Sequence, residues 1–131
     1  MIALDTNVLV RFLVEDEKEQ SRKAKKVIEK AMKDEEDIFV PDLVLVETVW
    51  VLKRSYDLKK DDIVKVLRML LTARRIRFES SDRLARTVSA YEKGRGGFSD
   101  YLIRELASEQ GCATVVTFDR VLQKDSGFSR P

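Results

Sequence analysis

The chain has 131 residues, of which 44% are hydrophobic and 37% are charged, a composition typical of one soluble globular domain spanning residues 1–131. Its net charge of +2 identifies no partner by itself. With no histidine and one cysteine, Cys112, the sequence excludes imidazole catalysis, an internal disulfide and a Cys/His zinc site, so any bound metal needs oxygen ligands, which favours Mg²⁺ or Mn²⁺.

The first half of the chain alternates short apolar runs with stretches of helical periodicity. Strands are predicted at Ile2–Leu4 and Ile38–Val40, and helices at residues 8–13, 17–34 and 42–56. Thr6 or Asn7 is the expected cap of the first helix. The acidic run 34–37 is typical of a solvated loop. The helix over 42–56 is apolar nearly all round, so we expect it to be covered on more than one side.

The second half continues the alternation. Helices are predicted from Asp61, over residues 82–93, and from a Ser99 cap to Gly111, with strands at 76–78 and 114–117. The tail after about residue 123 is expected to be loose. Strands alternating with helices predict an α/β fold in which helices cover both faces of a small parallel sheet.

Two carboxylates follow predicted strands. Asp5 ends the first strand, and Asp119 lies just past the last. Because sites in parallel α/β sheets form at the carboxyl ends of strands, both side chains are expected at one sheet edge. Each residue could also be an ordinary turn or capping residue.

Two further acids lie on predicted helices. Glu47 falls within an apolar arc that includes Leu43 and Trp50, where a carboxylate needs a partner, a proton or a cation. A salt bridge to Arg54 explains Glu47 equally well. Asp100 follows Gly96-Gly97 in the first helical turn, where aspartate complements the helix dipole and can pair with Arg104.

Carboxylates that converge on one point repel each other, and a divalent cation removes that conflict. Mg²⁺ takes six oxygen ligands and usually keeps several waters, which become better nucleophiles. In a chain without histidine, such a cluster is an economical route to phosphodiester hydrolysis.

Four segments carry a resemblance to a known family: Leu4-Asp5-Thr6-Asn7-Val8-Leu9, Leu45-Val46-Glu47, Phe98-Ser99-Asp100 and Val116-Thr117-Phe118-Asp119. In this order the chain resembles the PIN-domain nucleases, and most closely the VapC-type toxins of toxin–antitoxin pairs. The resemblance covers residues 2 to about 122. It implies a three-layer α/β/α sandwich with a small central parallel sheet.

The resemblance also implies an activity and its residues. It implies a Mg²⁺- or Mn²⁺-dependent endoribonuclease acting on structured RNA, often tRNA or rRNA, with an antitoxin partner and a homodimeric state. The acidic set that would hold the metal falls on Asp5, Glu47, Asp100 and Asp119. Supporting hydroxyl and amide groups fall on Thr6, Asn7 and Thr117.

Basic residues near the predicted loops are candidates for contacts with the RNA backbone. They are Arg11, Lys93, Arg95, Arg104 and Arg120. A second cluster consists of Arg22, Lys23, Lys25 and Lys26, where the glutamates on the same helix favour a solvated face.

Other interpretations remain open. A PIN nuclease that processes ribosomal RNA is the main alternative to a toxin, and a non-catalytic RNA-binding module of the same fold is another. A haloacid-dehalogenase-like phosphatase needs a second aspartate where Asn7 stands, and a receiver-like phosphoacceptor needs a lysine after a late strand. No segment predicts a signal peptide or membrane span, so we expect a cytoplasmic protein.

Overall fold

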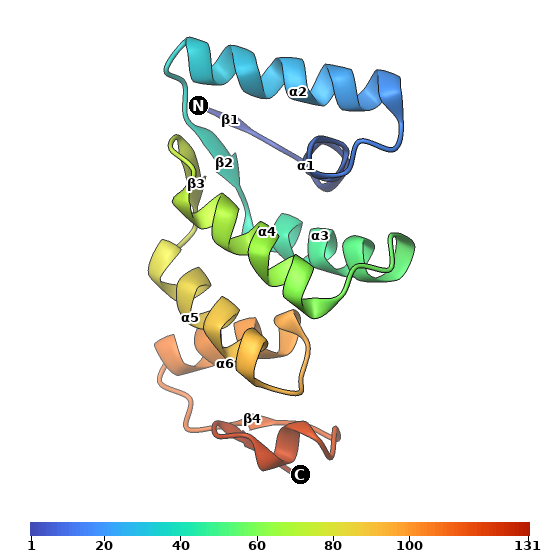
Figure 1. Ribbon diagram of the computed structural model, residues 1–131. Helices are drawn as coiled ribbons and strands as arrows, with labels where there is room; N and C mark the ends of the chain where they lie inside the picture. The colour runs from blue at the N-terminus through green and yellow to red at the C-terminus, as the bar shows by residue number, and fades with distance from the viewer. The chain divides into compact units, whose positions relative to one another are not determined.

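The computed structural model describes residues 1–131, and their contacts divide into two compact units, Met1–Ser81 and Asp82–Pro131. Figure 1 shows the course of the chain through the helices and strands of both units. The expectation of a single domain over residues 1–131 stays a prediction. No helix in the chain is both long enough and apolar enough to span a lipid bilayer.

The first unit is built on a three-stranded parallel sheet. Its strands are β1 (Ile2–Ala3), β2 (Ile38–Val40) and β3 (Ile76–Phe78), in the order β1-β2-β3. Ile2 pairs with Ile38, and Ile38 pairs with Ile76, so the three strands begin in register. Their carboxyl ends therefore share one edge, where Asp5 follows β1 and Pro41 follows β2.

Four helices connect these strands, two in each crossover. They are α1 (Thr6–Leu13), α2 (Lys18–Lys33), α3 (Asp42–Ser55) and α4 (Lys60–Thr72). Helix α1 packs against both α2 and α3. On α4, apolar residues three or four positions apart form the buried stripe, among them Ile63, Leu67 and Leu70.

The second unit begins at Asp82, the second residue of α5 (Ser81–Lys93). It also contains α6 (Phe98–Glu109), β4 (Val115–Val116), a 3₁₀ turn (Leu122–Lys124) and β5 (Phe128–Ser129). Tyr91 of α5 meets Phe98 of α6 edge-to-face, with ring centroids 6.0 Å apart. Strands β4 and β5 form a separate parallel pair with Val115 opposite Phe128.

The predicted fold class, α/β with parallel strands, is confirmed, but the strands divide between two sheets. Asp5 follows a strand of the first sheet and Asp119 follows a strand of the second. The expectation that both residues lie at the edge of one hydrogen-bonded sheet is therefore wrong. The expectation that the tail after about residue 123 is loose is also wrong. The Phe128 side chain is 8% exposed, and backbone bonds from Val115 and Thr117 to Gly127 and Ser129 hold β5 in place.

Two predicted caps fall at other residues. Asp5 caps α1, because its Oδ1 accepts the Val8 N–H at 3.0 Å, so the cap is neither Thr6 nor Asn7. Gly97 is the capping position of α6, and Ser99 lies inside the first turn. Sequence periodicity locates a helix better than it locates the residue at which the helix begins.

Candidate functional site

An open cavity of about 600 Å³ lies at the carboxyl edge of the first unit's sheet. Its polar lining comes from the β1–α1 junction and from α3, and consists of Asp5, Thr6, Asn7 and Glu47. The apolar lining is entirely from α3: Val44, Val46, Trp50 and Val51. Four residues of the predicted site in this unit are thus brought together, although Asp5 and Glu47 are separated by three secondary-structure elements in the sequence.

Each of the two carboxylates is positioned by one hydrogen bond and keeps a second oxygen available. Asp5 Oδ1 accepts the Val8 amide, and Glu47 Oε1 accepts the Thr6 hydroxyl at 2.7 Å. No basic side chain pairs with either acid, and the alternative of a Glu47–Arg54 salt bridge is not realised. The Arg54 guanidinium instead lies over the Trp50 ring, 5.3 Å from its centroid.

The apolar arc around Glu47 is exposed, not buried. Leu43 and Trp50 are 69% and 59% accessible, whereas the buried residues of α3 include Leu45, Thr48, Val49 and Leu52. The sequence argument that burial forces Glu47 to find a partner is therefore wrong. Glu47 lies between the apolar cavity residues Val46 and Trp50 on α3. Trp50 was not among the predicted site residues, and its position on the same helical face as Glu47 is the sequence feature that could have identified it.

In the second unit, Asp100 is held by the loop that precedes its helix. Its Oδ2 accepts the Gly97 N–H at 2.8 Å. The Arg104 pairing considered from the sequence is absent, because Arg104 interacts with Glu105, 3.5 Å away, and with the Ser126 carbonyl. One oxygen of Asp100 is thus engaged with the backbone and the other remains available.

The loop before Asp100 is fixed from beneath by Tyr101. The Tyr101 hydroxyl donates to Asp125 at 2.6 Å and accepts the Gly96 N–H at 2.9 Å. Burial, with the bond to Asp125, raises the pKa of Tyr101 above its usual value. A Cβ on Gly96 would lie 2.5 Å from the Leu122 side chain, so the close approach that needs glycine is made within the chain and not to a ligand.

Asp119 closes the turn after β4. Its Oδ1 accepts the amides of Val121 and Leu122 at 2.9 and 3.3 Å, and its own amide donates to the Thr117 hydroxyl at 3.0 Å. Thr117 therefore supports the Asp119 turn in the second unit, much as Thr6 supports Glu47 in the first. Asp119 is exposed and has no basic partner.

The four carboxylates share one arrangement: one oxygen bonds to the chain and the other does not. Oxygen ligands of this kind suit Mg²⁺ or Mn²⁺. Neither unit by itself gathers three ligands that could hold a metal ion. Each unit contributes two of the four acids, and their joint action stays a prediction.

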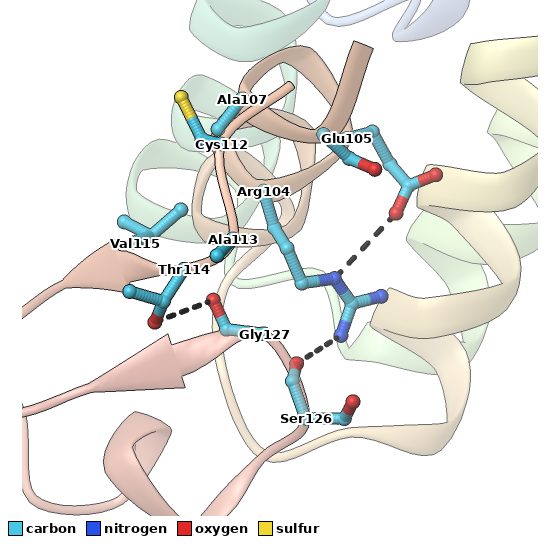
Figure 2. A pocket seen from close by; sticks show the side chains of 10 residues that line it. Arg104, Glu105, Ala107, Cys112, Ala113, Thr114, Val115, Ser126 and Gly127 are labelled. Carbon is cyan, nitrogen blue, oxygen red and sulfur yellow. Dashed lines mark hydrogen bonds and ion pairs between the residues drawn. The ribbon is translucent and has the colours of Figure 1, made fainter. Parts of the chain in front are cut away.

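Two of the five basic residues predicted to contact RNA, Arg11 and Arg104, are instead bonded to other groups of the chain. Arg11 bonds to Gln20 at 2.7 Å, Tyr56 at 2.9 Å and Asp16 at 3.3 Å, and the Tyr56 hydroxyl holds the pKa of Asp16 below its usual value. Arg104 reaches between Glu105 and Ser126 beside a cavity of about 340 Å³ (Figure 2). Its guanidinium also lies over Tyr101 and Phe128.

The other three candidates remain available for a ligand. Lys93, Arg95 and Arg120 are exposed and make no ion pair. Arg95 belongs to the glycine loop before Asp100, and Arg120 directly follows Asp119. Their contact with RNA stays a prediction.

Comparison with known proteins identifies the family of the chain. Residues 2–126 match the model of the PIN domain family. The chain is also 31% identical over 124 residues to a protein of Aquifex aeolicus (strain VF5) named VapC ribonuclease, covering 95% of this chain and 91% of that protein. The match of the family model over nearly the whole chain shows that this protein belongs to the PIN-domain family.

Proposed function

We propose that the protein is an endoribonuclease that hydrolyses phosphodiester bonds in structured RNA, with tRNA or rRNA as its substrate, and that it is the toxin of a type II toxin–antitoxin pair. The observation that carries the proposal is the cavity lined by Asp5 and Glu47, each with an oxygen free of any basic partner. The relative named VapC ribonuclease supports the same activity.

The proposed site uses Mg²⁺ or Mn²⁺ held by Asp5, Glu47, Asp100 and Asp119. When bound, such an ion activates water and neutralises charge on a phosphoryl oxygen. The donor set fits this ion, because it consists of oxygens and lacks the thiolate and imidazole ligands that zinc favours. The support from this chain is the available oxygen on each of the four carboxylates.

The chain's own groups position these oxygens. The Val8 amide fixes Asp5, the Gly97 amide fixes Asp100, and the Thr6 hydroxyl fixes Glu47. Thr117 supports the turn of Asp119. Asn7 lines the cavity with an exposed amide that can bind a phosphate oxygen or a water. In this proposal Glu47 completes the ligand shell or orients the attacking water.

Addition of Mg²⁺ or Mn²⁺ is expected to raise the melting temperature. The ion binds the folded acidic site and not the open chain, so at one hundred times its Kd it adds about 2.7 kcal/mol of stability. Thermal unfolding in millimolar Mg²⁺ and in EDTA measures the shift, and RNA cleavage should stop in EDTA and return with Mn²⁺. A matched variant, Glu47→Gln, should lose most of the shift; an equal shift in both proteins would place the ion elsewhere.

Expression of the wild-type chain is expected to arrest bacterial growth, whereas Asp100→Asn should not. Asparagine can still accept the Gly97 amide through its side-chain oxygen, so the helix start is preserved while the charge is lost. Asp82→Asn, in the first turn of α5, is the control with the same charge change and should remain toxic. Growth unaffected by the wild type, in a protein that cleaves RNA in vitro, would favour the RNA-processing nuclease over the toxin.

The proposal extends to partners and location. A cognate antitoxin would cover the acidic cavity, and the protein would act on cytoplasmic RNA as a homodimer. Leu43 and Trp50 on α3 and Met69 on α4 leave exposed apolar side chains that such protein partners could cover. Sedimentation of the purified chain, alone and with its antitoxin, tests both associations.

A further inference from the structure

Helix α2 holds a concentration of positive charge that the proposed site does not use. It carries seven basic and two acidic side chains, a net charge of +5, in a chain whose total is +2. The other 115 residues together are therefore net negative. A surface segment of this kind attracts polyanions and repels other cationic surfaces.

Most of these cations have no acidic partner. Lys23 pairs with Glu19 at 3.5 Å, and Lys30 pairs with Asp34 at 2.7 Å. The other five are exposed and make no ion pair: Lys18, Arg22, Lys25, Lys26 and Lys33. Basic residues four positions apart, such as Arg22 and Lys26, repel each other and weaken the helix slightly. A bound polyanion would relieve that repulsion.

The unpaired cations form one stripe. At about 100° per residue, the five fall within an arc of about 100° that runs from Lys18 to Lys33, about 22 Å along the helix axis. The buried residues of α2, Ser21, Ala24, Ile28 and Ala31, occupy the other side of the helix. Glu29 lies within the same arc and reduces its net charge to +4. We call these five cations the α2 stripe.

The flank of α2 beside the stripe leads towards the acidic cavity. Lys23 and Val27 line an open cavity of about 300 Å³ that Asp5 and Asn7 also line. Asp5 and Asn7 also line the larger cavity that Glu47 lines. A ligand lying along α2 therefore has a continuous path, within the first unit, to the Asp5 carboxylate. Helix α2 packs against α1, the helix that directly follows Asp5, and both helices are labelled in Figure 1.

We propose that the α2 stripe binds the phosphate backbone of the structured RNA that the enzyme cleaves. The inference rests on the proposed RNA substrate. Five cations along about 22 Å match a linear polyanion better than a single phosphate. A membrane surface fits poorly, because the apolar side of α2 lies in the core and leaves no free apolar face to insert.

The test compares two triple variants that remove the same charge from exposed, unpaired positions. Arg22→Gln, Lys25→Gln and Lys26→Gln alter the stripe; Lys53→Gln, Lys59→Gln and Lys65→Gln are the control. Binding of unfractionated tRNA is measured in EDTA between 50 and 200 mM salt, so that metal-dependent cleavage does not interfere. The stripe variant is expected to bind about tenfold more weakly, with a salt slope lower by about two to three, and the control to resemble the wild type.

Each outcome is decisive. Equal weakening in both variants, or none in the stripe variant, would overturn the proposal, as would a wild-type chain that binds no tRNA. Competition by polyglutamate as effective as that by tRNA at equal charge would assign the stripe to an acidic protein. If the stripe variant binds weakly as expected but the wild type cleaves no RNA with Mg²⁺ or Mn²⁺, the proposed function fails while the stripe stands.

Discussion

Asp5→Asn is expected to lower RNA cleavage by at least about a hundredfold while leaving the folded state nearly as stable as the wild type. The substitution removes the charge proposed to hold the metal. It preserves the start of α1, because an asparagine oxygen can accept the Val8 amide and asparagine caps helices about as well as aspartate. Initial cleavage rates on tRNA and thermal unfolding of the same preparation measure the two effects.

Two companion variants separate charge from capping. Asp5→Ala should lose activity and about 1 kcal/mol of stability, because it also deprives the Val8 amide of its acceptor. Glu17→Gln changes the charge of the residue that caps α2 through the amides of Glu19 and Gln20, away from the cavity. It should cleave RNA normally. Wild-type activity in Asp5→Asn would refute the assignment of the site.

Phe128→Ala is expected to destabilise the protein by about 3 kcal/mol. Phe128 is 8% exposed, meets Tyr101 edge-to-face at 6.2 Å, and lies under the Arg104 guanidinium. Its removal leaves a cavity beneath β5 and releases the segment that pairs with β4. Urea unfolding monitored by far-UV circular dichroism gives the change in free energy.

An exposed phenylalanine of the same unit provides the control. Phe118→Ala removes the same side chain from a position that is 87% exposed, so its effect on stability should stay within about 0.5 kcal/mol. Equal losses in both variants would mean that the C-terminal segment does not derive its order from the burial of Phe128. An unchanged Phe128→Ala protein would restore the expectation of a loose tail.

Periodicity predicted most of the elements. The apolar pattern of the sequence predicted all six helices. A helix that buries one face has apolar residues at intervals of three and four positions, and this spacing can be recognised in the sequence. The strands that begin at Ile38 and Ile76 were predicted from short runs that contain β-branched and aromatic residues. The same reasoning placed Asp5 and Glu47, which share a cavity, at a strand end and on an apolar helix.

What periodicity could not supply was contact between distant residues. The pairing of β5 with β4 depends on Gly127 at a positive φ of 89° and on a buried Phe128, and a two-residue strand is too short to show alternation. The partners of Arg11 and Arg104 come from α2, Tyr56 and Ser126, which only the folded chain brings near. From the sequence alone, a basic residue near a loop is therefore predicted to contact RNA even where the folded chain pairs it with its own polar groups.

Three acids of the proposed site, Asp5, Asp100 and Asp119, also close a helix start or a turn. Natural selection for folding alone would therefore retain them, even in a lineage whose enzyme had fallen silent. Persistence of these aspartates among homologues is a weak indicator of turnover. Glu47, whose only bond is to the Thr6 hydroxyl, has less to do in the apo fold, so its loss would be the earlier sign of a degenerate copy.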